Sequence, residues 1–357
     1  MRIRGIIALG ASLVCLACTH HAYSAEQCTP FGDPPAQVNQ KFLPRSIAAH
    51  NPICFGGRVV GPWKDSEGSD RYACIYEPEQ HSRDNPLPLL VFVHGSLATA
   101  DSIKLTGLTS GIETADLGGK KRGFILLAPE GRYTAHYYPG GIDSNAMGWD
   151  NWYRQLSPSG DVTIGGTTYR ENVDAATIDH FIQDEVATGE VDQSRIYLTG
   201  WSNGAAMAIL YGLNRQSIAA AAVYSAPNPF GALTDPCPQT PVAHAPTSNA
   251  EVQVFNPHLP LMHVRNSCDI VGLCPNGNAF ALQLRSLGVS LEDVILDADG
   301  KATASCDDTC GTNPIGDSNP GASGSLRGAA HHLRWPSAQN ARMFEFMRRH
   351  PLTLTGK

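Results

Sequence analysis

The stretch that decides the fold is Arg195-Ile196-Tyr197-Leu198-Thr199-Gly200-Trp201-Ser202-Asn203-Gly204-Ala205-Ala206-Met207-Ala208. A β-rich apolar run passes through a Gly-X-Ser-X-Gly pentad into good helix formers, which predicts a strand, a tight turn and a helix. Gly200 and Gly204 lack the Cβ atoms that would clash where the strand and the helix converge. In this context we expect Ser202 to be a nucleophile that projects above the sheet edge. The alternative is a small-residue turn in an ordinary βα unit.

Further apolar runs on both sides of this unit predict more strands of the same sheet. They span residues 87–93, 124–129, 218–225 and 259–265. Continuous apolar runs, rather than alternating ones, are typical of strands covered on both faces. Helices are expected over 171–189, 276–287 and 337–350, and residues 72–76 read as an edge strand. This order predicts an α/β fold, namely a doubly wound, mostly parallel sheet with helices on both faces.

A serine hydroxyl needs a base within hydrogen-bond reach and a group that orients the base. Asp269 follows the strand at 259–265, and His331 and His332 precede the last helix. The chain order Ser, Asp, His is that of α/β-hydrolases. We favour His332 as the base and keep His331 as the alternative, while Asp269 could instead belong to a surface turn.

Two backbone amides are candidates for an oxyanion hole. The amide of Asn203 begins a helix whose first N–H groups have no partner within the helix. The second amide is expected from the loop after residues 87–93, where Ser96 is the first choice and Leu97 the next. In the same loop, we expect His94 to shape the backbone rather than act as a second base.

Aromatic side chains lie in an irregular stretch over 132–170, which is the candidate for a substrate-facing loop. We predict that Trp149, Trp152 and Tyr138 bind substrate together with Trp201, the neighbour of the serine. The alternative is that some of these rings pack beneath the loop as a small core.

The N-terminus predicts export, because Arg2 and Arg4 precede an apolar stretch and small residues near Ala25. Residues 1–25 are therefore read as a signal peptide, 26–70 as an extended segment and 71–357 as the catalytic domain. Cys18 leaves a lipoprotein open as an alternative. The expected location is secreted or periplasmic, and no run is long enough to span a bilayer. Cleavage leaves 24 basic against 33 acidic residues, which argues against nucleic acid as a partner.

Of the ten cysteines, eight remain after the signal peptide, an even number that favours disulfides in an exported chain. We hypothesise that Cys268 pairs with Cys274 and fixes the loop that carries Asp269, although Cys237 or Cys306 could replace either partner. A zinc site at 306–310 is the rival interpretation. It lacks a second ligand pair at metal spacing, so no metal is expected.

Four segments together resemble the poly(3-hydroxybutyrate) depolymerase and feruloyl esterase family: residues 93–95, 174–181, 191–204 and 332–336. The match is most specific over 191–204, where it extends beyond the pentad. The resemblance implies an exported serine esterase with an α/β-hydrolase fold and no cofactor. Trp201, the two cysteines around Asp269 and the doubled histidine depart from the commoner pattern of the family.

We expect the chain to hydrolyse carboxylic esters through an acyl-enzyme on Ser202, with His332 moving the proton and Asp269 fixing its tautomer. A polyhydroxyalkanoate-type polyester or its oligomers, and feruloyl or acetyl esters of plant polysaccharide, are both open as substrates. A peptidase on the same fold is a further possibility. The competing class is a catalytically inactive secreted binding protein that keeps the fold. The sequence indicates no oligomeric state.

Overall fold

The computed structural model describes residues 51–65, 69–133, 147–149, 162–164, 167–169, 173–229, 254–269, 274–305 and 330–353. The expected signal peptide, Tyr138, Trp152 and the cysteines at 237, 306 and 310 lie outside these ranges. None of the helices in the described ranges is both long and apolar enough to cross a membrane.

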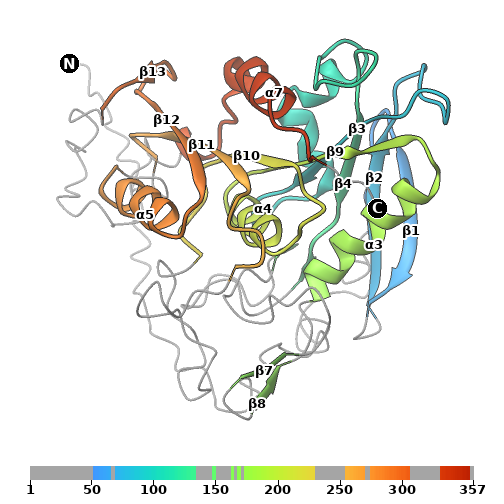
Figure 1. Ribbon diagram of the computed structural model, residues 1–357, viewed down its shortest axis with the longest axis horizontal. Helices are drawn as coiled ribbons and strands as arrows, with labels where there is room; N and C mark the ends of the chain where they lie inside the picture. The colour runs from blue at the N-terminus through green and yellow to red at the C-terminus, as the bar shows by residue number, and fades with distance from the viewer. Residues whose placement is uncertain are drawn as a thin grey trace, which may run out of the picture.

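Within the described part, one nine-stranded sheet forms the centre of the molecule, in the order β1-β2-β4-β3-β9-β10-β11-β12-β13 (Figure 1). Strands β4, β3, β9, β10, β11 and β12 run parallel to one another, and β1, β2 and β13 are antiparallel to their neighbours. The strands are β1 (Arg58–Lys64), β2 (Asp70–Tyr76), β3 (Leu87–Val93), β4 (Ile125–Pro129), β9 (Val191–Gly200), β10 (Ala220–Tyr224), β11 (Pro260–Asn266), β12 (Ser290–Leu296) and β13 (Ala302–Thr303). The predicted doubly wound, mostly parallel sheet is confirmed.

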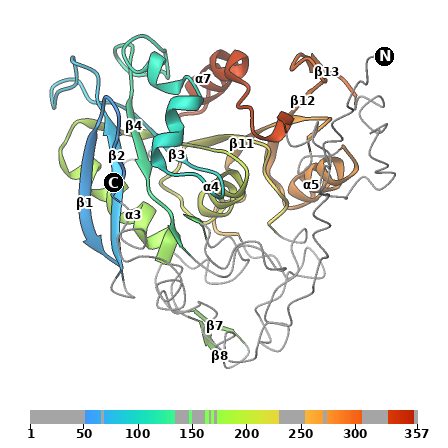
Figure 2. The same ribbon diagram turned by 180° about the vertical axis from the view of Figure 1, so that it is seen from behind.

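Helices cover both faces of this sheet (Figures 1 and 2). One face packs on α3 (Val173–Ala187), α4 (Asn203–Leu213) and α5 (Cys274–Ser286). The other packs on the 3-10 helices η2 (Ala100–Leu105) and η3 (Leu108–Gly111) and on α7 (Asn340–Arg348), which follows η6 (Ser337–Gln339).

Strand β3 shows why its run is apolar throughout. Leu89, Val91 and Val93 belong to the α3–α4–α5 core, and Leu90 and Phe92 belong to the core beneath α7. Every residue of β3 is buried because successive side chains point to opposite faces and both faces are covered.

Two expectations about the periphery need correction. The outer strand at this edge of the sheet is β1, not the segment at 72–76, and β1 lies inside the extended segment 26–70, to which we assigned no strand. Its sequence hid it because Gly61 and Pro62 interrupt the run, and the pairing with β2 shifts register between Val60 and Trp63. The stretch 132–170, expected to be irregular, also contains short hairpins: β5 (Arg132–Tyr133) with β6 (Met147–Gly148), and β7 (Val162–Ile164) with β8 (Thr167–Tyr169).

A disulfide joins the residue Cys54, ahead of β1, to Cys74 within β2, with a Cα–Cα distance of 5.3 Å. The bond attaches the edge of the sheet to its second strand. Cys268 is disulfide-bonded as well. Its partner sulfur is not among the described side chains, so the pairing with Cys274 stays a prediction.

Candidate active site

The turn between β9 and α4 has the backbone geometry that the pentad predicts. Ser202 adopts φ 57° and ψ −122°, a region that residues other than glycine rarely occupy. A Cβ atom on Gly204 would lie 2.1 Å from the carbonyl oxygens of Val93 and His94, and one on Gly200 would lie 2.6 Å from the carbonyl oxygen of Gly204. Both positions therefore exclude any side chain. The tight turn that they permit places Ser202 directly after β9, at the carboxyl end of the parallel strands.

Three predicted residues meet above this turn through hydrogen bonds. The hydroxyl of Ser202 lies 2.8 Å from Nε2 of His332, and Nδ1 of His332 lies 2.9 Å from Oδ1 of Asp269. Asp269 follows β11 and is fully buried, whereas the side chain of His332 is 12% exposed. Residues separated by 63 and 130 positions in the chain therefore form one continuous set of hydrogen bonds.

The direction of these hydrogen bonds follows from which groups can donate. An ionised carboxylate only accepts, so the proton between His332 and Asp269 lies on Nδ1. Nε2 of the neutral ring is then an acceptor and faces the hydroxyl of Ser202. This is the arrangement in which a histidine can take a proton from a serine.

A fourth residue, Ser225, was not found from the sequence. It follows β10, is completely buried and has φ 55°. Its hydroxyl donates to Oδ2 of Asp269 at 2.5 Å and lies 3.0 Å from Nδ1 of His332. A lone serine after a strand carries no spacing signal, and only the adjacency of β10 and β11 brings it to the carboxylate.

The backbone carbonyl groups of His331 and His332 each accept a hydrogen bond from an aromatic side chain. Nε1 of Trp201 donates to the carbonyl oxygen of His332 at 2.8 Å, and the hydroxyl of Tyr224 donates to that of His331 at 2.7 Å. Burial, followed by the charge of Asp269, raises the pKa of Tyr224, so its hydroxyl keeps its proton. Of the two candidate bases, the structure places the ring of His332 against Ser202.

The loop after β3 passes directly over the serine. A Cβ on Gly95 would lie 3.2 Å from the carbonyl oxygen of Trp201 and 3.5 Å from Cβ of Ser202, so the predicted oxyanion donor Ser96 is adjacent to this contact. His94 is buried, with Nε2 accepting from the amide of Gly131 at 2.8 Å and Nδ1 donating to the carbonyl oxygen of Gly95 at 2.8 Å. Both of its nitrogens are thus engaged in the loop, in agreement with a loop-shaping role.

The predicted substrate-binding tryptophans that the structure describes are buried. Trp149 has no exposed surface, and its indole N–H donates to the carbonyl oxygen of His94 at 2.9 Å. Its amide donates to the side chain of Asn203 at 2.8 Å, which secures the start of α4. Trp201 packs edge-on against Trp335. The expectation that these two rings form a substrate-facing surface is therefore corrected, because both are part of the framework under the site; Trp152 and Tyr138 lie outside the described residues.

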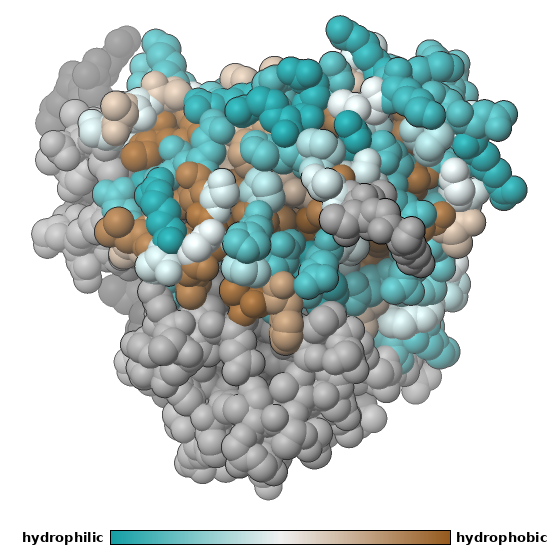
Figure 3. Space-filling model, viewed as in Figure 1, coloured by the Kyte–Doolittle hydropathy of each residue, from teal (hydrophilic) through white to brown (hydrophobic). Residues whose placement is uncertain are grey.

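Two exposed leucines are sequence neighbours of residues of the site. Leu97, next to Ser96, is 73% exposed, and Leu333, next to His332, is 71% exposed. On the face seen in Figure 3, apolar side chains of the described chain occur in small patches separated by polar ones. A site that binds an apolar ligand requires aliphatic surface of this kind near its reactive group.

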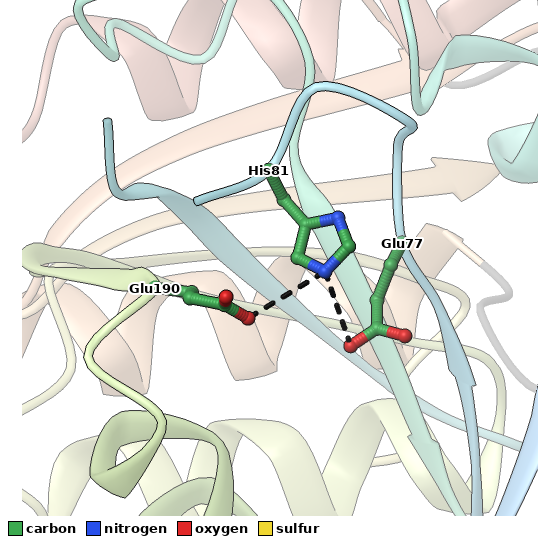
Figure 4. A group of neighbouring side chains, drawn as sticks. All are labelled: Glu77, His81 and Glu190. Carbon is green, nitrogen blue, oxygen red and sulfur yellow. Dashed lines mark ion pairs between the residues drawn. The ribbon is translucent and has the colours of Figure 1, made fainter. Parts of the chain in front are cut away.

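Among the described residues, one group could hold a metal ion: Glu77, His81 and Glu190, whose ligand atoms lie within 4.8 Å of one another (Figure 4). Nε2 of His81 lies 3.5 Å from Glu190 and 4.0 Å from Glu77. Arg58 already binds Glu77 through two nitrogens, at 3.0 and 3.3 Å. Ion pairing therefore accounts for this group. Glu77 and His81 follow β2 and Glu190 precedes β9, so the group lies at the end of the sheet opposite Ser202.

Comparison with protein-family models and with curated protein sequences finds no match. Among solved structures, the fold is similar to an S-formylglutathione hydrolase from Agrobacterium tumefaciens, with 12% identity, a TM-score of 0.51, and coverage of 85% of this chain and 99% of that one. A thermostable esterase matches with 14% identity, a TM-score of 0.48 and coverage of 84% of this chain. The match spans 64% of that esterase's length. The chain has an α/β-hydrolase fold.

Proposed function

We propose that the protein is a serine hydrolase of carboxylic esters that reacts through an acyl-enzyme on Ser202. The observation that carries the proposal is the hydrogen-bonded chain from Ser202 through His332 to the buried Asp269. Each group has the hydrogen-bond partner that its step requires. Ser202 also has a positive φ, and backbone strain of this kind is a feature of functional sites.

In the first half of the reaction, His332 Nε2 accepts the Ser202 proton while Oγ attacks the ester carbonyl carbon. The ring becomes an imidazolium next to the Asp269 carboxylate, whose charge stabilises it. His332 then gives the proton to the leaving alcohol, and the acyl group remains on Oγ. In the second half, His332 takes a proton from a water molecule that attacks the acyl carbon, the bond between the acyl carbon and Oγ breaks, and His332 returns the proton to Oγ as the acid is released.

The tetrahedral intermediate carries a negative oxygen that needs donors. We assign this role to the amides of Asn203 and Ser96. The first belongs to the start of α4, and the second belongs to the loop that contacts Ser202 through Gly95. A helix start adds the favourable end of its dipole to such an amide.

For the substrate we favour an aliphatic hydroxyalkanoate ester, either a polyester or its oligomers. Leu97 and Leu333, the sequence neighbours of Ser96 and His332, offer exposed aliphatic surface, and the two described tryptophans are buried and not available for stacking on an aromatic acyl group. A feruloyl or acetyl ester is the second candidate. It is supported by the sequence resemblance alone.

A disulfide between Cys54 and Cys74 is typical of an oxidising compartment. Together with the N-terminal sequence it supports export, to the medium or the periplasm, as part of the proposal.

The test is a substrate panel of 3-hydroxybutyrate oligomers, feruloyl esters and short p-nitrophenyl esters. We expect kcat/KM for the oligomers to exceed that for feruloyl esters by about 10-fold or more. Leu97→Ser and Leu333→Ser should raise KM for the oligomers. Leu282→Ser is the matched control, because Leu282 is 66% exposed but lies on α5. Preferential turnover of feruloyl esters would replace the aliphatic substrate with an aromatic one, and turnover of no ester would reject the proposal.

A further inference from the structure

Ser225 occupies a backbone conformation that side chains disfavour. Its φ of 55° is one of four positive values recorded for residues other than glycine in the described chain, and Ser202 has another of them. Two hydrogen bonds fix this conformation: the Ser225 amide donates to the carbonyl oxygen of Val264 at 2.9 Å, and the Ala226 amide donates to Nε2 of His263 at 3.2 Å. A disfavoured conformation that its neighbours enforce is a feature of functional sites.

His263 is suited to this support because it stays neutral. The ring is completely buried, and burial lowers its pKa to about 4. A neutral imidazole keeps a lone pair on one nitrogen, which the Ala226 amide requires. The strand β11 therefore supplies both acceptors that hold Ser225 in place, and it also leads directly to Asp269.

The hydroxyl of Ser225 has one proton and lies between two members of the site. It donates to Oδ2 of Asp269 at 2.5 Å. Toward Nδ1 of His332, 3.0 Å away, it can then only accept. The proton on Nδ1 is thus shared between Oδ1 of Asp269 and Oγ of Ser225, and Nε2 is left as the acceptor that faces Ser202.

We propose that Ser225 is a positioning residue that locks the Asp269 carboxylate and the tautomer of His332; this inference rests on the proposed esterase function. Ser225 is buried and acts through these two groups rather than on the substrate. Its donated hydrogen bond holds Oδ2, so that Oδ1 remains directed at the ring. Its lone pair gives Nδ1–H a second acceptor when the imidazolium forms.

Ser225→Ala removes the hydroxyl and keeps a Cβ atom. We expect kcat to fall about 10- to 100-fold with KM unchanged, the scale of a catalytic group that is displaced by a fraction of an ångström to about 1 Å. Loss of the second acceptor leaves the imidazolium less stabilised, so the acid limb of the kcat/KM profile should move to lower pH. Within the described part of the chain, the His332 ring forms hydrogen bonds with Ser202, Ser225 and Asp269, of which Asp269 carries a charge.

Ser225→Gly separates the effect of the lost hydroxyl from the effect of backbone strain at the positive φ. Glycine adopts a positive φ without strain, so this variant should unfold at a higher temperature than Ser225→Ala while losing the same activity. It also keeps the test valid if the alanine variant folds poorly. Activity that follows thermal stability rather than the hydroxyl would overturn the inference.

A double-mutant cycle with Asp269→Asn tests the route of action. Because Asp269→Asn already disturbs both the carboxylate and the His332 tautomer through which Ser225 acts, Ser225→Ala should cost less than about 3-fold in the Asp269→Asn background. Ser202→Ala, assayed in parallel, tests the proposed function itself. If Ser202→Ala abolishes turnover while Ser225→Ala retains the wild-type kcat and pH profile, the inference fails and the esterase assignment stands. If Ser202→Ala remains active, the assignment fails.

Discussion

Two histidines at opposite ends of the sheet each have carboxylate neighbours, but their surroundings differ. His332 lies after the carboxyl ends of the strands, with hydrogen bonds of 2.8 and 2.9 Å to a serine and to a buried aspartate. His81 lies at the amino end near Glu77 and Glu190, at 4.0 and 3.5 Å, and its side chain is 29% exposed. The two sites contain similar residue types, but the contacts of His332 are short hydrogen bonds, whereas those of His81 are longer ion pairs.

The difference comes from what fixes each ring. Trp201 and Tyr224 hold the backbone around His332 from below, and Ser225 and Asp269 hold its Nδ1. His81 has a hydrogen bond from Nδ1 to the carbonyl oxygen of Pro78, three residues earlier, and otherwise partly exposed charges that water screens. A histidine becomes a usable base when a buried acceptor fixes one nitrogen and the other nitrogen faces the hydroxyl whose proton it takes, as Asp269 and Ser202 do for His332.

The largest effect should follow from removing the ring at the carboxyl end. His332→Ala is expected to lower kcat by up to about 10⁶-fold, because the serine loses its base. His331→Ala is the matched control, since Tyr224 holds its carbonyl oxygen and not its ring. We expect the control to stay within about 10-fold of wild type. The reverse order, measured by p-nitrophenyl ester turnover, would move the base by one residue.

Next in size is Asp269→Asn, which keeps the shape but offers an N–H or a neutral oxygen to Nδ1 and permits the wrong tautomer. We expect about 10⁴-fold loss in kcat. Asp297→Asn is the control, because Asp297 follows β12 and its carboxylate accepts from the amides of its own turn. Equal losses in both variants would show that Asp269 has no special role.

At the amino end, the buried Glu185 predicts an effect on stability. Burial, opposed by Arg58 and assisted by nearby acids including Glu77, raises its pKa to about 7 from 4.5. The native state therefore binds the proton more tightly than the unfolded state does. This contribution to the free energy of unfolding is complete below about pH 4.5 and is lost as the pH rises through about 7, on the order of 2–3 kcal/mol.

Glu185→Gln should remove that dependence. Urea unfolding at pH 5 and pH 8 should show the variant gaining stability relative to wild type as the pH rises. Asp184→Asn is the control, because the carboxylate of Asp184, which precedes Glu185 in α3, is 61% exposed and pairs with His180. A difference between wild type and Glu185→Gln that is the same at both pH values would contradict the raised pKa.

The smallest effect is expected for His81→Gln. Its ion pairs are partly exposed, so the free energy of unfolding should change by less than about 1 kcal/mol, with ester turnover unchanged. Added Zn²⁺ should shift Tm equally in wild type and variant. A larger shift in the wild type would identify the group as a metal site, and a loss of turnover would link the two ends of the sheet.

Local sequence was sufficient where local geometry decides the structure. The glycines around Ser202 and the apolar runs predicted the turn and the central strands, and strand ends located Asp269. What the sequence left open depends on contacts between distant segments. Ser225 reaches Asp269 only through the pairing of β10 with β11, and Trp149 is buried because the β5–β6 hairpin brings it to Asn203. Neither relation has a spacing pattern along the chain.

The measurement that tests the central claim most directly is covalent labelling with a serine-reactive fluorophosphonate, followed by peptide mass spectrometry. Only a serine with a working base reacts rapidly with such a probe. We predict one label per chain, on the peptide that contains Ser202, no label in Ser202→Ala and greatly slowed labelling in His332→Ala. Labelling of Ser202→Ala at the wild-type rate, or a wild-type label on a different serine, would contradict the account.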